Sequence, residues 1–112
     1  MANVLTVFRS RLADGAYDSG YEARAEEMLQ RAQSMPGFVE FKSFTAPDGE
    51  RVSIIQFDSP DAQHAWATDA EHRAAQREGR ESFYAEYRIV VAEVTSDRSW
   101  RDRAGEVVTP PV

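Results

Sequence analysis

Residues 35–57 read MPGFVEFKSFTAPDGERVSIIQF, and this stretch decides the fold. Pro36 cannot continue a helix and Gly37 suits the left-handed exit from one, so a helix should end near Met35. Two runs rich in β-branched and aromatic residues follow, at 38–45 and 51–57, and we expect both to be strands. Pro-Asp-Gly between them is a turn signal. The stretch therefore predicts a β-hairpin that directly follows a helix.

The residues before this hairpin predict one strand and one helix. Residues 4–12 are rich in β-branched and aromatic side chains and end before a turn signal at Asp14-Gly15, so we expect a strand there. Apolar side chains then recur at spacings of four and three, which is the period of an amphipathic helix. They are Tyr17, Tyr21, Ala25, Met28, Ala32 and Met35.

The residues after the hairpin predict a second helical region and a last strand. Ser59-Pro60-Asp61 supplies an N-cap, a first-turn proline and an acid at the positive end of the helix dipole. The helix that starts there should break near residues 69–72, and a shorter helical piece should reach Gly79. Residues 87–95 predict the last strand. We expect residues 1–96 to form one domain and residues 97–112 to be a disordered tail or an arm that embraces a dimer partner.

The order strand, helix, strand, strand, helix, strand is typical of a ferredoxin-like βαββαβ α+β sandwich, in which helices cover one face of a four-stranded antiparallel sheet. Alternation makes both sheet faces apolar, because Leu5 and Val7 point away from Val4 and Phe8. An exposed apolar face of this size is unusual for a monomer. We therefore expect the same face of a second copy to cover it, as in a dimeric α+β barrel.

Composition excludes several classes of function. The 112 residues carry 19 acidic and 13 basic side chains, a net charge of -6, which argues against a nucleic-acid partner. The absence of cysteine excludes disulfides, thiolate catalysis and thiolate-bound metals. No apolar run approaches the roughly 18 residues of a membrane span, and the first residues do not resemble a signal peptide. We expect a cytoplasmic protein without a membrane partner.

The segment from Trp66 to Ile89 holds most of the reactive side chains and reads as one wall of a pocket. Together with Met35-Pro36-Gly37-Phe38 and Phe41-Lys42-Ser43-Phe44, it carries a resemblance. From about Val4 to Val94 the chain resembles the antibiotic biosynthesis monooxygenase (ABM) family, small dimeric α+β barrel proteins. The resemblance implies oxidation of a small hydrophobic phenolic or polyketide-like substrate by dioxygen, with no cofactor and no metal.

Such an oxidation needs a base, a donor for the developing oxyanion and aromatic walls that exclude water. His72 is the nearby side chain whose ordinary pKa suits a base at neutral pH. Trp66 and Tyr84 are expected to form walls and to donate hydrogen bonds, which completes the catalytic set. The expected substrate-binding residues are Phe8, Arg9, Phe83, Tyr87 and Arg88, of which Arg9 or Arg88 would stabilise a phenolate.

Each of these residues also has a structural interpretation. His72 could cap a helix end or bond a carboxylate, Trp66 could belong to the core, and Tyr84 or Tyr87 could anchor the junction between helix and strand. Two functional alternatives also stay open. One is haem binding or degradation, although Gln76 stands where similar haem-degrading proteins carry the iron-ligating histidine. The other is a non-catalytic dimeric module that binds a hydrophobic metabolite.

Overall fold

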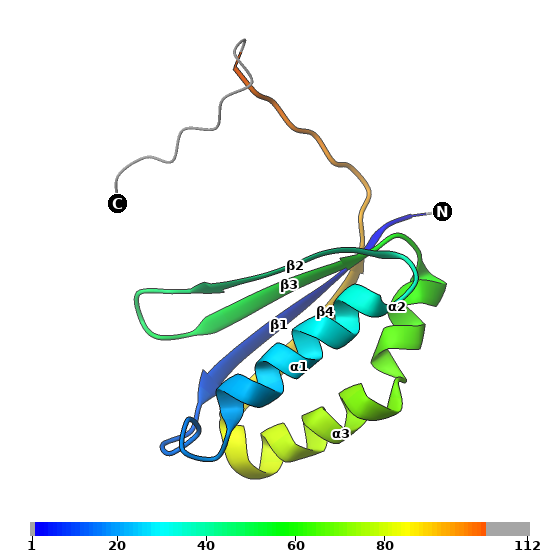
Figure 1. Cartoon of the computed structure of the whole chain (residues 1–112). Helices are drawn as coiled ribbons and strands as arrows, with labels where there is room; N and C mark the ends of the chain where they lie inside the picture. Colours follow the sequence, from blue (N-terminus) through cyan, green and yellow to red (C-terminus); the bar gives the residue numbers. More distant parts are fainter. Residues whose placement is uncertain (1, 103–112) are drawn as a thin grey trace.

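The computed structural model describes residues 2–102 and shows a single sheet with helices on one side (Figure 1). The elements in chain order are β1 (Val4–Leu12), α1 (Tyr21–Ser34), β2 (Phe38–Thr45), β3 (Arg51–Phe57), α2 (Pro60–Ala67), α3 (Ala70–Glu78), a π-helical turn (Gly79–Phe83) and β4 (Tyr84–Glu93). The strands pair antiparallel in the order β2-β3-β1-β4. The predicted ferredoxin-like α+β fold is confirmed.

The predicted hairpin and the end of the first helix are also confirmed. Gly37 has a φ of +83°, and its carbonyl accepts a hydrogen bond of 2.8 Å from the backbone N–H of Asp58. At the tip of the hairpin Gly49 has a φ of +91°. Both values lie in the left-handed region that glycine adopts without a steric penalty. The two glycines therefore set the points at which the chain enters β2 and turns into β3.

Side-chain caps define the helices between β3 and β4. The Ser59 hydroxyl accepts a hydrogen bond of 3.1 Å from the Ala62 N–H at the start of α2. Asp69 caps α3 in the same way, because its carboxylate accepts a bond of 3.1 Å from the His72 N–H. The break predicted near residues 69–72 falls between α2 and α3, one or two residues earlier.

Two predicted boundaries were wrong. The first helix begins at Tyr21 instead of Tyr17, because residues 14–20 form turns that end at Gly20 in a left-handed conformation. The last strand begins at Tyr84 instead of Tyr87, because the π-helical turn ends at Phe83 and a register shift after Arg11 lets Leu12 pair with Tyr84. This shift brings Tyr84 onto the sheet, where it helps to line the cavity described below.

The buried core lies on the helix-covered face of the sheet, whereas apolar side chains on the open face remain exposed. On the covered face Ile55, Phe57 and Trp66 are buried together with Ala32 of α1. On the open face Phe44 remains 49% exposed and Val90 37% exposed. Arg9 also belongs to the open face, where its guanidinium makes two hydrogen bonds to the Glu50 carboxylate, of 2.9 and 3.1 Å.

Within residues 2–102 no helix has both the length and the apolar character needed to cross a membrane. The expected cytoplasmic location stays a prediction, as does the division of the chain at residue 96. After β4 the chain leads away from the sheet, and Trp100 is 85% exposed (Figure 1). Most of the predicted tail or arm, residues 103–112, lies outside the described residues.

Candidate active site

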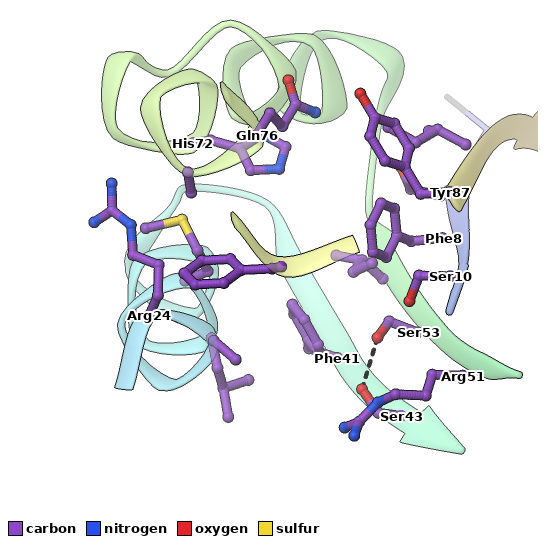
Figure 2. A pocket seen from close by; sticks show the side chains of 18 of the residues that line it. Phe8, Ser10, Arg24, Phe41, Ser43, Arg51, Ser53, His72, Gln76 and Tyr87 are labelled. Carbon is purple, nitrogen blue, oxygen red and sulfur yellow. Dashed lines mark hydrogen bonds between the residues drawn. The ribbon is translucent and has the colours of Figure 1, made fainter. Parts of the chain in front are cut away.

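A cavity of about 470 Å³ lies between the covered face of the sheet and the helices. All four strands contribute its floor, and α1, α2 and α3 contribute its walls. Figure 2 shows His72 and Gln76 projecting from α3 on one side and the strand residues Ser43, Ser53 and Arg51 on the other. Because several aromatic side chains separate these two groups, the cavity suits a flat hydrophobic molecule with polar atoms at its ends.

His72 stacks on Trp66, so the two side chains form one wall. Their ring centroids are 3.9 Å apart and the ring planes differ by 18°. Nδ1 of His72 lies 3.1 Å from the Trp66 carbonyl oxygen, which can only accept a hydrogen bond. Nδ1 therefore carries the proton, and Nε2 of the neutral ring is the acceptor. Together with the Asp69 cap on the His72 N–H, these contacts hold the imidazole in one orientation.

The protonation of His72 suits a base. Burial lowers the pKa of His72 below its ordinary value of 6.5, and the Trp66 carbonyl and the Asp69 carboxylate only partly oppose this effect. The imidazole is therefore neutral at pH 7, with the Nε2 lone pair available. The contacts also satisfy the structural interpretation, since His72 bonds the last turn of α2. One residue thus closes a helix end and presents a base.

Trp66 is both a core residue and a cavity residue. It is 3% exposed and belongs to the buried cluster with Ile55 and Phe57, and it also lines the cavity. Its ring centroid lies 6.3 Å from that of Phe57. Substitution at Trp66 would therefore disturb packing and the site together, which makes this residue a poor probe of chemistry.

A cluster of aromatic rings around Tyr84 forms the end of the cavity away from Trp66. Tyr84 lies with its ring centroid 5.3 Å from Phe8, 5.9 Å from Tyr87 and 6.0 Å from Tyr21, each in an edge-to-face arrangement. Burial raises the pKa of the Tyr84 hydroxyl well above its ordinary value, with Tyr21 adding to the effect. Tyr84 therefore stays protonated and can donate a hydrogen bond, but it cannot act as a base at neutral pH.

Gly79 makes room for Tyr84. A Cβ atom at position 79 would lie 2.7 Å from Cε2 and 2.8 Å from Cδ2 of the Tyr84 ring. The backbone of Gly79 is helical, with a φ of -58°, so alanine would fit the backbone there without strain. Glycine is therefore needed at position 79 because the Tyr84 ring occupies the space that a side chain would fill.

We expect Gly79→Ala to displace the Tyr84 ring and to lower the free energy of unfolding by about 1–3 kcal/mol through overpacking. Thermal unfolding measures this change. In a Tyr84→Ala background the same Gly79→Ala substitution should be neutral or stabilising, because alanine favours a helix over glycine. Equal destabilisation in both backgrounds would show that Tyr84 is not what position 79 accommodates.

Arginines of α1 hold α3 over the cavity. Arg31 makes two hydrogen bonds to the Asp69 carboxylate, of 2.7 and 3.2 Å, and this pairing lowers the pKa of Asp69. Arg24 reaches Glu71 at 3.6 Å and Glu78 at 3.4 Å. Since these pairs are partly exposed, each contributes little stability. They connect the helix that carries His72 to the opposite wall.

Six of the eight side chains predicted for the site line this cavity: Phe8, Trp66, His72, Phe83, Tyr84 and Tyr87. Arg9 and Arg88 are not brought to it. These two residues are cross-strand partners on the open face, where strand alternation points them away from the helices. An open-face arginine cannot reach a phenolate in this cavity, so neither belongs to the site proposed below.

The sequence interpretation missed the polar residues of the floor: Thr6, Ser10, Ser43, Arg51 and Ser53. A signal for them was present, since Thr6 and Ser10 alternate with outward-facing residues on the same side of β1 as Phe8. Arg51 and Ser53 share a side of β3 with Ile55 in the same way. Polar residues on a covered face mark a site where the sheet is not sealed by packing.

The chain is thus a small α+β protein in which an aromatic cavity, with a histidine in its wall, lies between the covered face of a ferredoxin-like sheet and the helices. The comparisons with known proteins agree with this class. Residues 4–78 match the family described as antibiotic biosynthesis monooxygenase, and the chain belongs to that family. The resemblance inferred from the sequence is confirmed.

One relative is similar in sequence and two solved structures are similar in fold. An uncharacterised protein of Bacillus subtilis, YqjZ, is 34% identical over 89 residues, which cover 80% of this chain and 78% of YqjZ. The structure of Rv0793 from Mycobacterium tuberculosis has a TM-score of 0.75 at 15% identity and covers 88% of this chain and 100% of its own. A variant of SnoaB, a cofactor-independent oxygenase from Streptomyces nogalater, has a TM-score of 0.72 at 14% identity, with 87% and 97% covered. At these identities the two structures support the fold alone.

Proposed function

We propose that this protein is a cofactor-independent monooxygenase that oxidises a small hydrophobic phenol or anthrone with dioxygen in this cavity. The observation that carries the proposal is the state of His72. Its Nδ1–H is bonded to the Trp66 carbonyl, burial keeps the ring neutral, and Nε2 remains as the acceptor in an aromatic site. A neutral base among aromatic side chains, in a cavity of low polarity, is what the first step requires.

In this proposal Nε2 of His72 removes a proton from the substrate, which leaves an electron-rich phenolate or enolate. The anion passes one electron to dioxygen, and the resulting substrate radical and superoxide combine through a new carbon–oxygen bond. The imidazolium returns its proton to the peroxide. Loss of the remaining hydrogen from the same carbon and cleavage of the O–O bond then give a carbonyl and water. One dioxygen is consumed for each quinone formed.

Trp66 and Tyr84 serve as walls in this scheme. The stacked Trp66 indole fixes the imidazole plane, and the Tyr84 hydroxyl stays protonated, so that it would donate a hydrogen bond to an oxygen of the substrate in place of its Tyr21 partner. Phe8 and Tyr87 lie with ring centroids 5.6 Å apart and form the aromatic surface on the sheet side. SnoaB, which shares this fold, is a cofactor-independent oxygenase, so the fold can accommodate this type of reaction.

Haem fits the side chains of this cavity less well. His72 is the one imidazole among the described lining residues, and it lies flat against Trp66. Gln76, in the place of the ligating histidine of similar haem-degrading proteins, offers an amide instead of a strong iron ligand. Within residues 2–102 no three histidine, aspartate or glutamate side chains gather as a metal site would require.

The experiment that tests the proposal uses a panel of polycyclic phenols and anthrones with the purified, metal-stripped protein. An oxygen electrode measures dioxygen uptake, and absorbance measures quinone. We expect quinone formation with one dioxygen consumed per product, at a rate that a chelator leaves unchanged. Binding of these compounds without any consumption would contradict the proposal and favour a binding module. A saturable Soret shift with haemin, lost in His72→Asn, would favour the haem alternative.

We also propose that a second copy covers the open face of the sheet, so that two chains form a dimeric α+β barrel. Its support is the apolar surface left by Phe44 and Val90, which the helices of the same chain cannot reach. Light scattering should then give twice the chain mass of 12.6 kDa. A mass of one chain at micromolar concentration would contradict this arrangement, and Phe44→Asp should shift the dimer toward that mass.

A further inference from the structure

The floor of the cavity has a polar corner formed by Ser10, Ser43, Arg51 and Ser53. Strand register brings these residues together, because Ser53 pairs with Ser43 across β2 and β3, and Arg51 pairs with Ser10 across β3 and β1. The Ser43 and Ser53 hydroxyls lie 2.7 Å apart. Figure 2 shows the four side chains gathered on the side of the cavity away from His72. The corner is therefore a set of hydrogen-bond donors at a fixed place in the floor.

Arg51 is the cation of this corner, and no carboxylate within residues 2–102 forms an ion pair with it. Its Nη1 donates a hydrogen bond of 3.2 Å to the Tyr17 hydroxyl, and its guanidinium carbon lies 5.4 Å from the Tyr21 ring centroid. These contacts orient the guanidinium without neutralising it. By contrast, Arg9 and Arg24 are both paired with glutamates.

Because the charge of the Arg51 guanidinium is not neutralised, the ligand group that fits this corner best is an anion. The chain has a net charge of -6, so its overall field disfavours anionic ligands unless a local group attracts one. A guanidinium has five N–H donors in a planar fork that matches a carboxylate, and the Tyr17 contact uses one of them. One of the two serine hydroxyls donates to the other, which leaves the second free to donate to the same anion. A neutral hydrocarbon would offer no acceptor to the remaining guanidinium N–H groups or to the second serine hydroxyl, at a free-energy cost.

Thr6 is a further polar residue of the cavity floor. Thr6 is 7% exposed, lines the cavity, and its Oγ1 has no hydrogen-bond partner among the residues that the structure describes. On the floor Thr6 pairs with Ile55, and Ser53, two residues before Ile55, belongs to the polar corner. Because Thr6 Oγ1 has less than 1 Å² of accessible surface, Thr6 adds a polar position to the floor but offers no exposed hydroxyl to a ligand.

We infer that the substrate of this protein is an aromatic acid, whose carboxylate binds Arg51 and the Ser43–Ser53 pair while the phenol O–H or anthrone C–H that loses its proton lies toward His72. Phe8 and Phe41 flank the ring system between these two ends (Figure 2). The inference rests on the proposed function and adds the chemical class of the substrate. The acid holds the ring in one direction, so that His72 meets the acidic proton and not the carboxylate.

The test compares two probes that differ only in charge, 6-hydroxy-2-naphthoic acid and its primary amide, by calorimetry at pH 7.5. We expect the wild type to bind the acid about tenfold or more tightly than the amide, because charge-assisted hydrogen bonds replace neutral ones. Arg51→Gln should remove this preference and leave amide binding within about twofold. Arg77→Gln, an exposed charge-matched control outside the cavity, should keep the preference.

Ser53→Ala provides a second route should Arg51→Gln fail to fold. It should weaken binding of the acid by about fivefold and leave the amide unchanged. Equal binding of acid and amide by the wild type, a preference that survives in Arg51→Gln, or no binding of either probe would overturn the inference. Binding with the expected preference but no oxidation would leave the anion site standing and contradict the proposed monooxygenase activity instead.

Discussion

His72→Asn will lower kcat for anthrone oxidation by a factor of about 10²–10⁴, the usual contribution of general base catalysis. Asparagine can place its amide nitrogen where Nδ1 donates to the Trp66 carbonyl, so the end of α2 keeps its bond. It has no basic nitrogen to replace Nε2. The loss should therefore fall on kcat and leave binding of the anthrone nearly unchanged. Initial rates of quinone formation measure it.

His64→Asn is the matched control, because His64 is exposed on α2 and does not line the cavity. It should retain full activity. The pH profile provides a further check: since burial lowers the pKa of His72 below 6.5, kcat/KM should hold from pH 8 to about 6.5 and fall only in more acidic solution. Unfolding stability should decline over the same acidic range, because the unfolded chain binds the proton more readily. Undiminished turnover by His72→Asn would remove His72 from the mechanism.

Gly37→Ala will destabilise the fold by about 2–5 kcal/mol and lower Tm by about 8 °C or more. Gly37 has a φ of +83°, where an L-residue is strained, and a Cβ would lie 2.5 Å from Asp58 Oδ1 and 2.6 Å from the Ala62 Cβ. This contact joins the start of β2 to the start of α2. Relief of the clash would require α2 to move, and α2 carries Trp66. Chemical and thermal unfolding measure the change.

Gly49→Ala separates the two causes. Gly49 has a φ of +91° but no atom within 4 Å of a Cβ, so its substitution carries the backbone strain without the clash. We expect a loss of about 1–2 kcal/mol at this position. If both variants lost the same stability, the claim that a Cβ at Gly37 clashes with α2 would be contradicted.

Local sequence signals predicted most of the fold because they act over a few residues. Pro36-Gly37, the Pro-Asp-Gly turn and the Ser59 cap each determine an element boundary through backbone chemistry, and all three boundaries are confirmed. The two boundaries that failed have different causes, a local turn that the apolar spacing does not reveal and a pairing between distant strands. Tyr17 continues the apolar spacing of α1 but lies in a turn before Gly20, and Tyr84 joins β4 only through a register shift against Leu12.

The lining of the cavity was predictable where its residues cluster in sequence. Trp66, His72 and Tyr84 lie within one segment, and all three line the cavity. The stack of His72 on Trp66 and the bond to its carbonyl depend on how α2 and α3 meet, which no spacing rule describes. Arg9 illustrates the opposite error, because its residue type suggested a role that the direction of its side chain excludes.

One measurement tests the central proposal most directly: an anaerobic titration of the metal-stripped protein with 1,8-dihydroxyanthrone, followed by admission of ¹⁸O₂. The proposal predicts that the absorbance of the bound anion appears before oxygen enters. It then predicts a quinone with one ¹⁸O atom, formed much more slowly by His72→Asn. An anthrone that binds as its neutral form and remains unchanged beyond its spontaneous oxidation after oxygen enters would contradict the account.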